Sequence, residues 1–208
     1  MRRPSIRCFT NQRRASNVAY LTNTILKVYL GITESTDDTL LTTLITAAQA
    51  AIDAFCRQTF EAAADTTRYF DPTLDAAGRW LYLDAPLAAI TSVTNGDGNT
   101  VTSGNYITEP RNVTPYRALV LKGNSTVAWT WTTTPENSIA IVGKWAYSTS
   151  APADVAQACT RLAAYLYRQK NNSGDLDRAM VIGANAMLLP SELPKDVYTL
   201  LRPYRRLI

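Results

Sequence analysis

Residues 21–60 read LTNTILKVYLGITESTDDTLLTTLITAAQAAIDAFCRQTF, and this stretch predicts a short helix, a turn and a long second helix. The hydroxyl oxygen of Thr22 can cap the first helix by accepting a hydrogen bond from a free backbone N–H group. Gly31 follows at the position where a left-handed residue commonly ends a helix. Asp37 or Asp38 can start the second helix, because acidic side chains are favoured at the positive end of the helix dipole.

The second predicted helix carries an apolar stripe. Its apolar side chains recur at three- and four-residue steps, which place them on one face of a helix. Burying the stripe should contribute on the order of 10 kcal/mol before the loss of chain entropy is subtracted. The opposite side holds Thr, Gln and Ala, and such a face can pack against a neighbouring protein as readily as against water. The stripe consists of Leu41, Leu44, Ile45, Ala48, Ile52 and Phe55.

The chain contains no histidine among its 208 residues. This absence removes the usual general base, the Ser–His and Cys–His nucleophile pairs and the commonest metal ligand. The cysteines Cys8, Cys56 and Cys159 are far apart and form no CxxC motif, so we interpret them as reduced core residues. No run of roughly 18 apolar residues predicts a membrane-spanning helix. We therefore expect a protein that is not an enzyme, binds no cofactor or metal and does not enter a membrane.

Positive charge is concentrated at the two ends of the chain. Residues 1–18 form a basic arm with five arginines and no acidic residue, and removing those five from the net charge of +4 leaves −1. The last fourteen residues carry a net +3, which leaves about −4 for the middle. Basic ends on a mildly acidic body indicate docking tails rather than a broad nucleic-acid-binding face. The arginines of the arm are Arg2, Arg3, Arg7, Arg13 and Arg14.

Residues 66–149 predict a small antiparallel β module, a sandwich or barrel, because short β-rich runs alternate with turns. The sequence NGDGN at residues 95–99 is a strong hairpin signal, since Asn and Gly accept a positive φ. We interpret Trp129, Trp131 and Trp145 as core and rim residues of this module rather than as a ligand site. The predicted strands cover residues 66–72, 79–84, 87–95, 100–108, 117–121, 126–132 and 138–147.

Helix returns at residues 152–169, where a second apolar stripe is the natural partner of the first. This stripe consists of Val155, Cys159, Leu162 and Leu166. A polar loop then leads into an apolar segment that a subunit, a partner or the core must cover. That segment contains Met180, Val181, Ile182, Met187, Leu188 and Leu189. The chain ends in a predicted helix at residues 191–201, which Pro203 breaks, and in a basic, aromatic tail.

Taken in order, these pieces resemble the head–tail connector, or adaptor, proteins of tailed bacteriophages and gene transfer agents. Residues 21–60 match the patterns LxxxKxYLxI, D-D-x-L-L and A-x-x-x-I-x-x-[FY]-x-x-[RK]-x-F of such proteins. The match continues through TRYFD, RWLYLDAPLAAITSV and LAAYLYRQK, and it resembles the longer members that carry a β insertion. It covers roughly residues 21–170. The arm before residue 17 is not part of the pattern, and the residues after 170 match it only loosely.

The resemblance implies an α+β fold with four parts. These are the arm (1–18), a helical connector core (19–65 and 150–170), an inserted antiparallel β module (66–149), and a loop, short docking helix and tail (171–208). In the core, the two N-terminal helices would pack on the later helix.

The resemblance also implies a structural virion protein of the neck, assembled in the host cytoplasm. Such adaptors form a ring, usually of twelve copies, between the portal and the stopper or tail-completion proteins. DNA passes through the lumen without sequence-specific binding. The tail would dock on the portal, so deleting residues 191–208 should abolish binding and leave the fold intact. The docking residues would be Tyr198, Leu201, Arg202, Tyr204, Arg205 and Arg206.

Two other functions compete with this one. The basic arm could make the protein a nucleic-acid-binding module whose affinity falls steeply with salt. Its composition also resembles a transit peptide, although it has no amphipathic stripe. A carboxylate-dependent hydrolase is the other alternative, because Asp71, Asp75 and Asp84 lie near two aromatic residues of the β module. Asp is simply favoured beside turns, however, which argues against catalysis.

Overall fold

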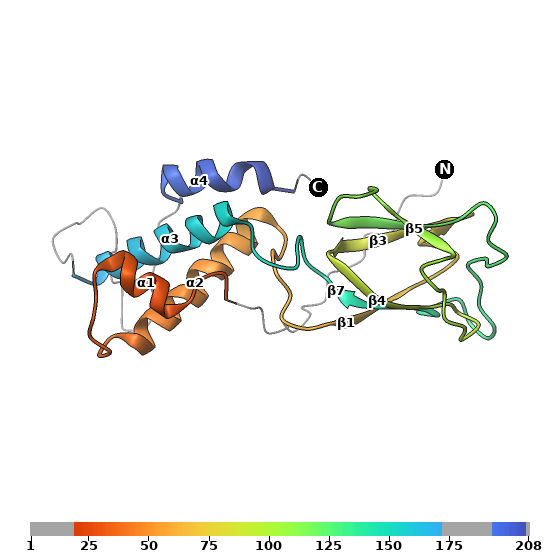
Figure 1. The fold of residues 1–208 in the computed structure, drawn as a ribbon, viewed down its shortest axis with the longest axis horizontal. Coiled ribbons are helices and arrows are strands. Elements are labelled where there is room, and N and C mark those ends of the chain that lie inside the picture. The colour runs from red at the N-terminus through yellow and green to blue at the C-terminus, as the bar shows by residue number, and fades with distance from the viewer. Residues whose placement is uncertain (1–18, 172–192, 207–208) are drawn as a thin grey trace.

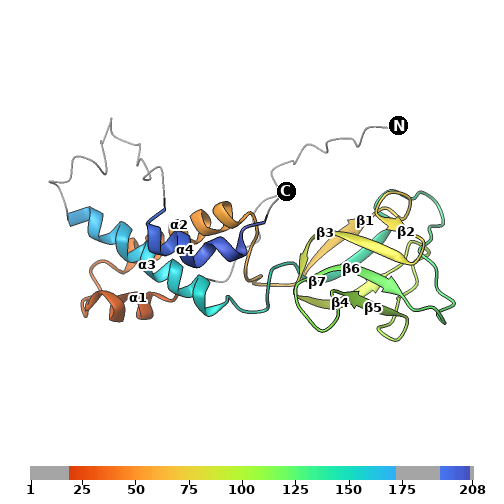
Figure 2. The same ribbon diagram turned by 90° about the horizontal axis from the view of Figure 1, so that it is seen from above.

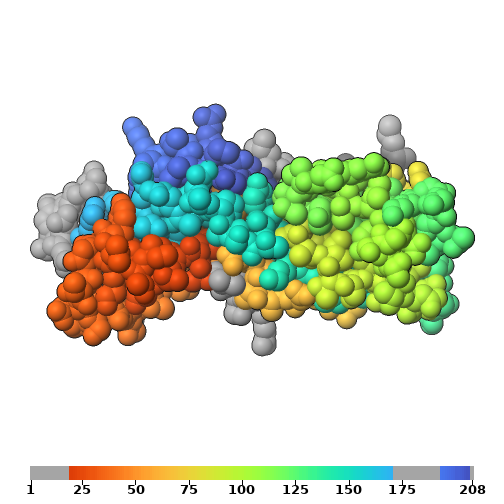
Figure 3. All heavy atoms as spheres, in the orientation of Figure 1, coloured from red at the N-terminus to blue at the C-terminus, as the bar shows by residue number. Residues whose placement is uncertain are grey.

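The computed structural model describes residues 19–171 and 193–206, so the basic arm and the predicted apolar segment at 180–189 lie outside the described residues. The helices gather at one end of the molecule and the strands at the other (Figures 1 and 2). The space-filling view shows the two parts in contact along an elongated molecule (Figure 3). The helices are α1 (Asn23–Leu30), α2 (Asp38–Cys56), α3 (Ala153–Asn171), α4 (Lys195–Leu201) and the 3-10 turn η1 (Arg202–Tyr204). The strands are β1 (Thr66–Phe70), β2 (Ala76–Ala77), β3 (Trp80–Leu87), β4 (Ala89–Thr94), β5 (Tyr106–Glu109), β6 (Tyr116–Leu121) and β7 (Ile139–Lys144).

The predicted cap and turn around α1 are confirmed. The Thr22 hydroxyl accepts a hydrogen bond from the Ile25 N–H at 3.4 Å. Gly31 ends the helix with a φ of +72°, a left-handed conformation that glycine adopts without steric cost. Asp37 precedes α2, but its carboxylate makes no capping hydrogen bond. It instead accepts hydrogen bonds from the α3 side chains Tyr167 and Lys170, and this ties the start of α2 to the end of α3.

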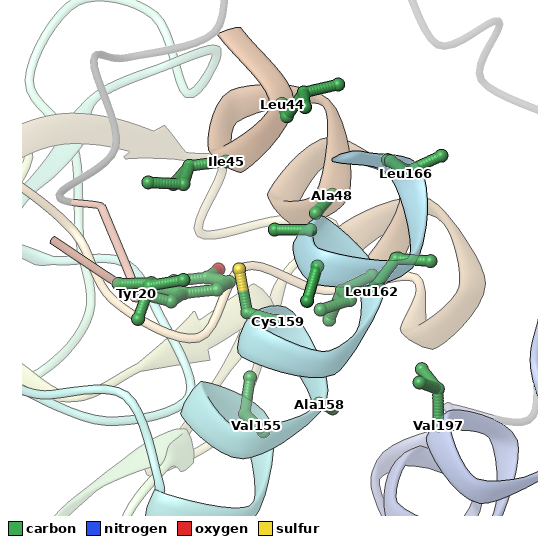
Figure 4. Packing of buried hydrophobic residues seen from close by; sticks show 14 of the residues in the cluster. Tyr20, Leu44, Ile45, Ala48, Val155, Ala158, Cys159, Leu162, Leu166 and Val197 are labelled. Carbon is green, nitrogen blue, oxygen red and sulfur yellow. The ribbon is translucent and has the colours of Figure 1, made fainter. Parts of the chain in front are cut away.

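Helices α2, α3 and α4 share one hydrophobic core. Both predicted stripes are buried in it, with Phe55 half-buried at the edge. Figure 4 shows Cys159 of α3 beside Tyr20, with Ile45 and Ala48 of α2 nearby and Val197 on the other side of α3. Helix α2 is long and apolar enough to cross a membrane by length and composition alone. The core helix of a soluble protein passes the same test, and the stripe of α2 is buried against other helices.

One prediction for the outer side of α2 is wrong. The composition of that side predicts an exposed Gln, but Gln49, the glutamine of α2, is buried. Its amide oxygen accepts the backbone N–H of Tyr20 at 3.4 Å. The segment that precedes α1 therefore covers this part of α2, and a buried polar side chain needs such a hydrogen bond.

The strands form two antiparallel sheets, in the orders β1-β7-β4 and β2-β3-β6-β5. Inward-facing residues of both sheets meet in a second hydrophobic cluster, for example Phe70 and Ile141 from the first sheet and Leu81 and Leu119 from the second. Trp129 and Trp145 are buried in this cluster. The described residues form four α-helices and two antiparallel sheets, and the predicted α+β class is confirmed.

The hairpin signal is confirmed over a short length. The Asn95 N–H donates to the Asn99 carbonyl at 2.8 Å, and Gly98 has a φ of +82°. The strand predicted at 100–108 is shorter, because only β5 at 106–109 is a named strand.

The strand predicted at 126–132 is wrong. The Asn95 side chain bonds to the backbone of this segment in place of a neighbouring strand. Its amide N–H donates to the Ala128 carbonyl at 2.8 Å, and its amide oxygen accepts a hydrogen bond from the Thr130 N–H at 3.3 Å. The Trp129 indole N–H donates to the Arg79 carbonyl at 3.0 Å, which holds the ring in the core. Val127 and Trp129 pack in the module without pairing in a ladder, whereas Trp131 is 42% exposed and makes only an isolated bridge to Gly96.

The chain crosses between helices and strands at two neighbouring places. The Tyr147 N–H donates to the Thr59 carbonyl at 2.9 Å, and the Ser148 N–H donates to the Phe60 carbonyl at 3.1 Å. The strands therefore form one continuous excursion between α2 and α3 that leaves and returns at a single point, here called the junction. The predicted boundaries of the domains stay a prediction.

The C-terminal helix begins later than predicted. α4 starts at Lys195, with Pro194 at the capping position, and Ser191 lies outside the described residues. Pro203 does not end the helical path at once, because it occupies the start of the 3-10 turn η1, where a missing N–H costs nothing.

Candidate functional site

The described part of the tail, residues 202–206, folds back onto the junction. The Tyr204 ring centroid lies 5.5 Å from those of Phe60 and Tyr147, edge to face with both. The Gln58 amide donates to the Tyr204 carbonyl at 2.7 Å. The Arg206 N–H donates to the carbonyl of Cys56, the last residue of α2, at 3.1 Å. The tail therefore has a defined position in the folded chain.

The predicted docking residues separate into two groups. Leu201 is fully buried in the helical core, so it presents no surface to a partner and instead holds α4 in place. Tyr198 is 43% exposed, with its ring centroid 5.5 Å from that of Phe55. The Arg205 guanidinium lies over the Phe55 ring at 5.5 Å, a cation–π contact. Arg202 is exposed beside them. Docking on a portal by these residues stays a prediction.

A pocket of about 390 Å³ opens where the tail meets the β module. Three arginines line it: Arg205 and Arg206 from the tail and Arg117 from β6. Arg117 could not be predicted as a site residue, because a single arginine in RALVL is no signal of a site and nothing in the sequence places β6 beside the tail. Gln58, Tyr147 and Tyr204 also line the pocket.

The charge of this pocket is not balanced within the described chain. Among residues 19–171 and 193–206, no carboxylate lies within ion-pair distance of the three arginines. Burial lowers the pKa of the Arg206 guanidinium and Arg117 lowers it further, while Asp84 opposes both effects. Asp84 itself pairs with Arg68 at 2.6 Å. Arg117 and Arg206 thus repel each other in this pocket, and Arg205 adds a third basic residue to its lining.

The three candidate catalytic carboxylates serve the local structure. Asp71 accepts hydrogen bonds from the N–H and hydroxyl of Thr73, at 2.8 and 2.7 Å. Asp75 accepts the Asp71 N–H at 2.8 Å, and Asp84 forms the ion pair with Arg68. Within the described ranges, no group of three or more His, Cys, Asp or Glu side chains could hold a metal ion. These contacts are those of turn residues and a strand ion pair.

A second surface lies on the outer sides of α1 and α2. Ile25, Val28 and Tyr29 follow the helical spacing and are all exposed, Val28 by 78%. On α2, the exposed threonine hydroxyls bond to backbone carbonyls four residues earlier, at 2.9–3.0 Å. Such back-bonding satisfies the hydroxyl within the helix, so the face is less polar than its composition suggests. The exposed residues of this face include Thr39, Thr42, Thr43, Thr46, Ala47 and Ala54.

Comparison with known proteins decides the family. A family model described as "Head completion protein" matches residues 19–207. The chain belongs to the head completion protein family. The resemblance to head–tail connectors is thereby confirmed. No curated protein matches this head completion family member.

Solved structures match this head completion family member over almost its full length. Against the structure entitled "Neck of empty GTA particle computed with C6 symmetry", the identity is 16% and the TM-score 0.54, covering 96% of this chain and 95% of that one. Against "Neck of native GTA particle computed with C12 symmetry", the values are 19% and 0.53, covering 94% and 97%. Against "Virion of native gene transfer agent (GTA) particle", they are 19% and 0.54, covering 96% and 95%. At these identities the likeness shows a shared fold.

Proposed function

We propose that this head completion family member is a structural, non-catalytic protein of the virion neck. It would act as an adaptor between the portal and the stopper or tail-completion protein, after assembly in the host cytoplasm. The full-length likeness to chains from particle necks, together with the family match, carries this proposal. Those two necks were computed with sixfold and twelvefold symmetry, and a ring of twelve copies satisfies both.

The outer faces of α1 and α2 support a ring. A closed ring needs two different, complementary surfaces on each copy. The large exposed side chains of α1 (Ile25, Val28 and Tyr29) offer one surface, and the small residues of α2 offer another of different shape. DNA would pass through the lumen without sequence-specific contacts.

The exposed side chains of α4 and the tail support portal docking. Tyr and Arg anchor many protein interfaces. Tyr198 and Arg205 both lie against Phe55, the Arg206 backbone bonds to Cys56, and Arg202 is exposed. Leu201 would act indirectly by fixing α4. The apolar segment at 180–189 stays a prediction as a partner-covered surface.

The decisive experiment measures the mass of assemblies. Native mass spectrometry and sedimentation would be run on the full chain alone and mixed with the portal protein encoded beside it. We expect a ring, alone or only with the portal. A protein that stays monomeric and does not bind the portal protein would contradict the proposal.

The basic arm supports a second candidate function, the binding of nucleic acid. Its five arginines could bind nucleic acid electrostatically, with a steep dependence on salt. A gel shift at low salt comparing the full chain with a chain lacking residues 1–18 tests this. If both chains bind nucleic acid equally, or if neither binds it, the arm is not a nucleic-acid site.

A further inference from the structure

The pocket at the junction collects arginines from parts of the chain that are far apart in sequence. Arg117 belongs to β6, whereas Arg205 and Arg206 follow η1 in the tail. In Figure 1, α4 lies over α3 and runs toward the strands, and so the residues that follow it reach the β module. The convergence therefore depends on the folded arrangement of three elements.

The backbones that carry the arginines are held in place by contacts of other groups, and only Arg205 has a described contact of its charge, over the Phe55 ring. The tail backbone is fixed by the Gln58 hydrogen bond to the Tyr204 carbonyl and by the Arg206 hydrogen bond to the end of α2. Arg117 sits on a strand whose next four residues are buried. Guanidinium groups remain protonated under ordinary conditions, so their mutual repulsion persists. Burial and then Arg117 depress the pKa of Arg206, and Asp84, which is paired with Arg68, offsets this only in part.

The chemistry that relieves such a cluster is a carboxylate. The planar guanidinium fork donates two parallel hydrogen bonds to a carboxylate, and these charge-assisted bonds are about twice as strong as neutral ones. The tyrosines and the Gln58 amide complete a lining of the type found at protein interfaces.

The surroundings favour a protein carboxylate over a nucleic-acid phosphate. Six of the chain's 21 basic residues and three of its 17 acidic residues lie outside the described ranges. The described residues therefore hold 15 basic and 14 acidic side chains. The described part is thus close to neutral, whereas nucleic-acid binding depends on neutralising many phosphates along an extended basic surface. A concave pocket of about 390 Å³ has room for one or two acidic side chains.

We propose that the pocket formed by Arg117, Arg205 and Arg206 is a receptor site for an acidic segment, bearing Asp or Glu, of the protein that docks on the tail. The inference rests on the proposed function, because it takes the acidic segment to belong to the portal. It adds a residue of the β module, Arg117, to a surface otherwise built from α4 and the tail.

The test uses the full-length protein with Arg117→Gln, because Arg117 lies outside the tail and its loss leaves α4 unchanged. The matched control is Arg168→Gln, which removes the same charge from an exposed position on α3. Binding to the portal protein would be measured at several salt concentrations. We expect Arg117→Gln to weaken binding about tenfold and to lower its salt dependence, with the control like the wild type. Equal binding by both variants would overturn the inference and leave portal docking intact.

A second probe separates failure of the site from failure of the function. A fluorescent octaglutamate peptide would be titrated into the wild type and both variants at low salt. Binding that Arg117→Gln alone weakens supports the pocket even if the portal does not bind. The proposal would be overturned if the peptide did not bind the wild type. It would also be overturned if duplex DNA displaced the labelled peptide at a lower concentration than unlabelled octaglutamate does. A fall of several degrees in the melting temperature of Arg117→Gln, but not of the control, would overturn it as well. The last would mean that the pocket already holds an acidic group of its own chain.

Discussion

At the scale of single residues, Tyr20 links the beginning of the described chain to the junction. Its hydroxyl donates to the Asp53 carboxylate at 2.6 Å and accepts the Phe60 N–H at 2.8 Å. Burial, followed by the nearby Asp53 charge, raises the pKa of Tyr20, so the hydroxyl stays protonated and able to donate. One side chain thus holds α2 and the start of the excursion in register.

Replacing Tyr20 by Phe should destabilise the protein, because it removes both hydrogen bonds from a buried site. We expect a loss of about 1–3 kcal/mol in the free energy of unfolding, measured by urea denaturation. Tyr29→Phe is the matched control, since Tyr29 is exposed on α1. Equal stability of the two variants would show that the Tyr20 hydroxyl is not important for the fold.

The carboxyl of Asp37 should make stability depend on pH. Hydrogen bonds from the Tyr167 hydroxyl and then from Lys170 hold the pKa of Asp37 below its usual value. A depressed folded-state pKa means that the contribution is present above the unfolded pKa of about 4 and is lost as the pH falls through the folded pKa. Melting curves of the wild type and Asp37→Asn should therefore differ at pH 7 and converge below about pH 4. A difference in melting temperature between the two proteins that stays constant down to acid pH would contradict this role.

The two core cysteines should be inert in the folded protein. Burial raises the pKa of the Cys56 and Cys159 thiols to about 12, and the thiolate is the reactive form. In a Cys8→Ser background, Ellman's reagent should label neither thiol until denaturant is added. Rapid labelling under native conditions would show that the helical core opens readily.

At the scale of elements, α4 is part of the core as well as of the proposed docking surface. Val197 and Leu201 are fully buried, and Arg161 of α3 pairs with Asp196 at 2.9 Å. Deleting residues 191–208 would therefore open the helical core, so the expectation that the deletion leaves the fold intact does not hold. Surface substitutions are the appropriate tests of docking.

Leu201→Ala should cost about 2–5 kcal/mol of stability, because it leaves a cavity in the helical core. Thr199→Ala, at an exposed position of the same helix, should change stability by no more than about 0.5 kcal/mol. Thermal or chemical denaturation of both variants measures the difference. A small effect at Leu201 would place α4 on the surface rather than in the core.

The exposed stripe of α1 should matter for assembly and not for folding. Val28→Glu changes a side chain that is 78% exposed, so the melting temperature should stay within a few degrees. A buried charge in the ring contact would be costly, so assembly measured by native mass should be lost. Leu74→Glu is the matched control at the strand end of the molecule, where Leu74 is 69% exposed. Normal rings with Val28→Glu would exclude α1 from the contact.

At the scale of the whole molecule, the sequence predicts what depends on local pattern. The stripes of α2 and α3, the Thr22 cap and the Gly31 turn follow from spacing and backbone preference. The pairing of 126–132 was wrong, because the Asn95 side chain competes for that backbone. Arg117 and Leu201 show the other limit: whether a residue reaches a pocket or the core depends on which elements meet in space, and no local pattern carries that information.

The junction has a consequence for the history of such proteins. The carbonyl of Thr59 and the N–H of Tyr147 lie 2.9 Å apart, so everything between them is, for the helices, a closed loop. The DNA that encodes the β module could therefore be gained, exchanged or lost in one genetic event. The helices before and after it would keep their packing. Length differences among relatives should then concentrate between these two positions, and an alignment of many genomes would reveal it.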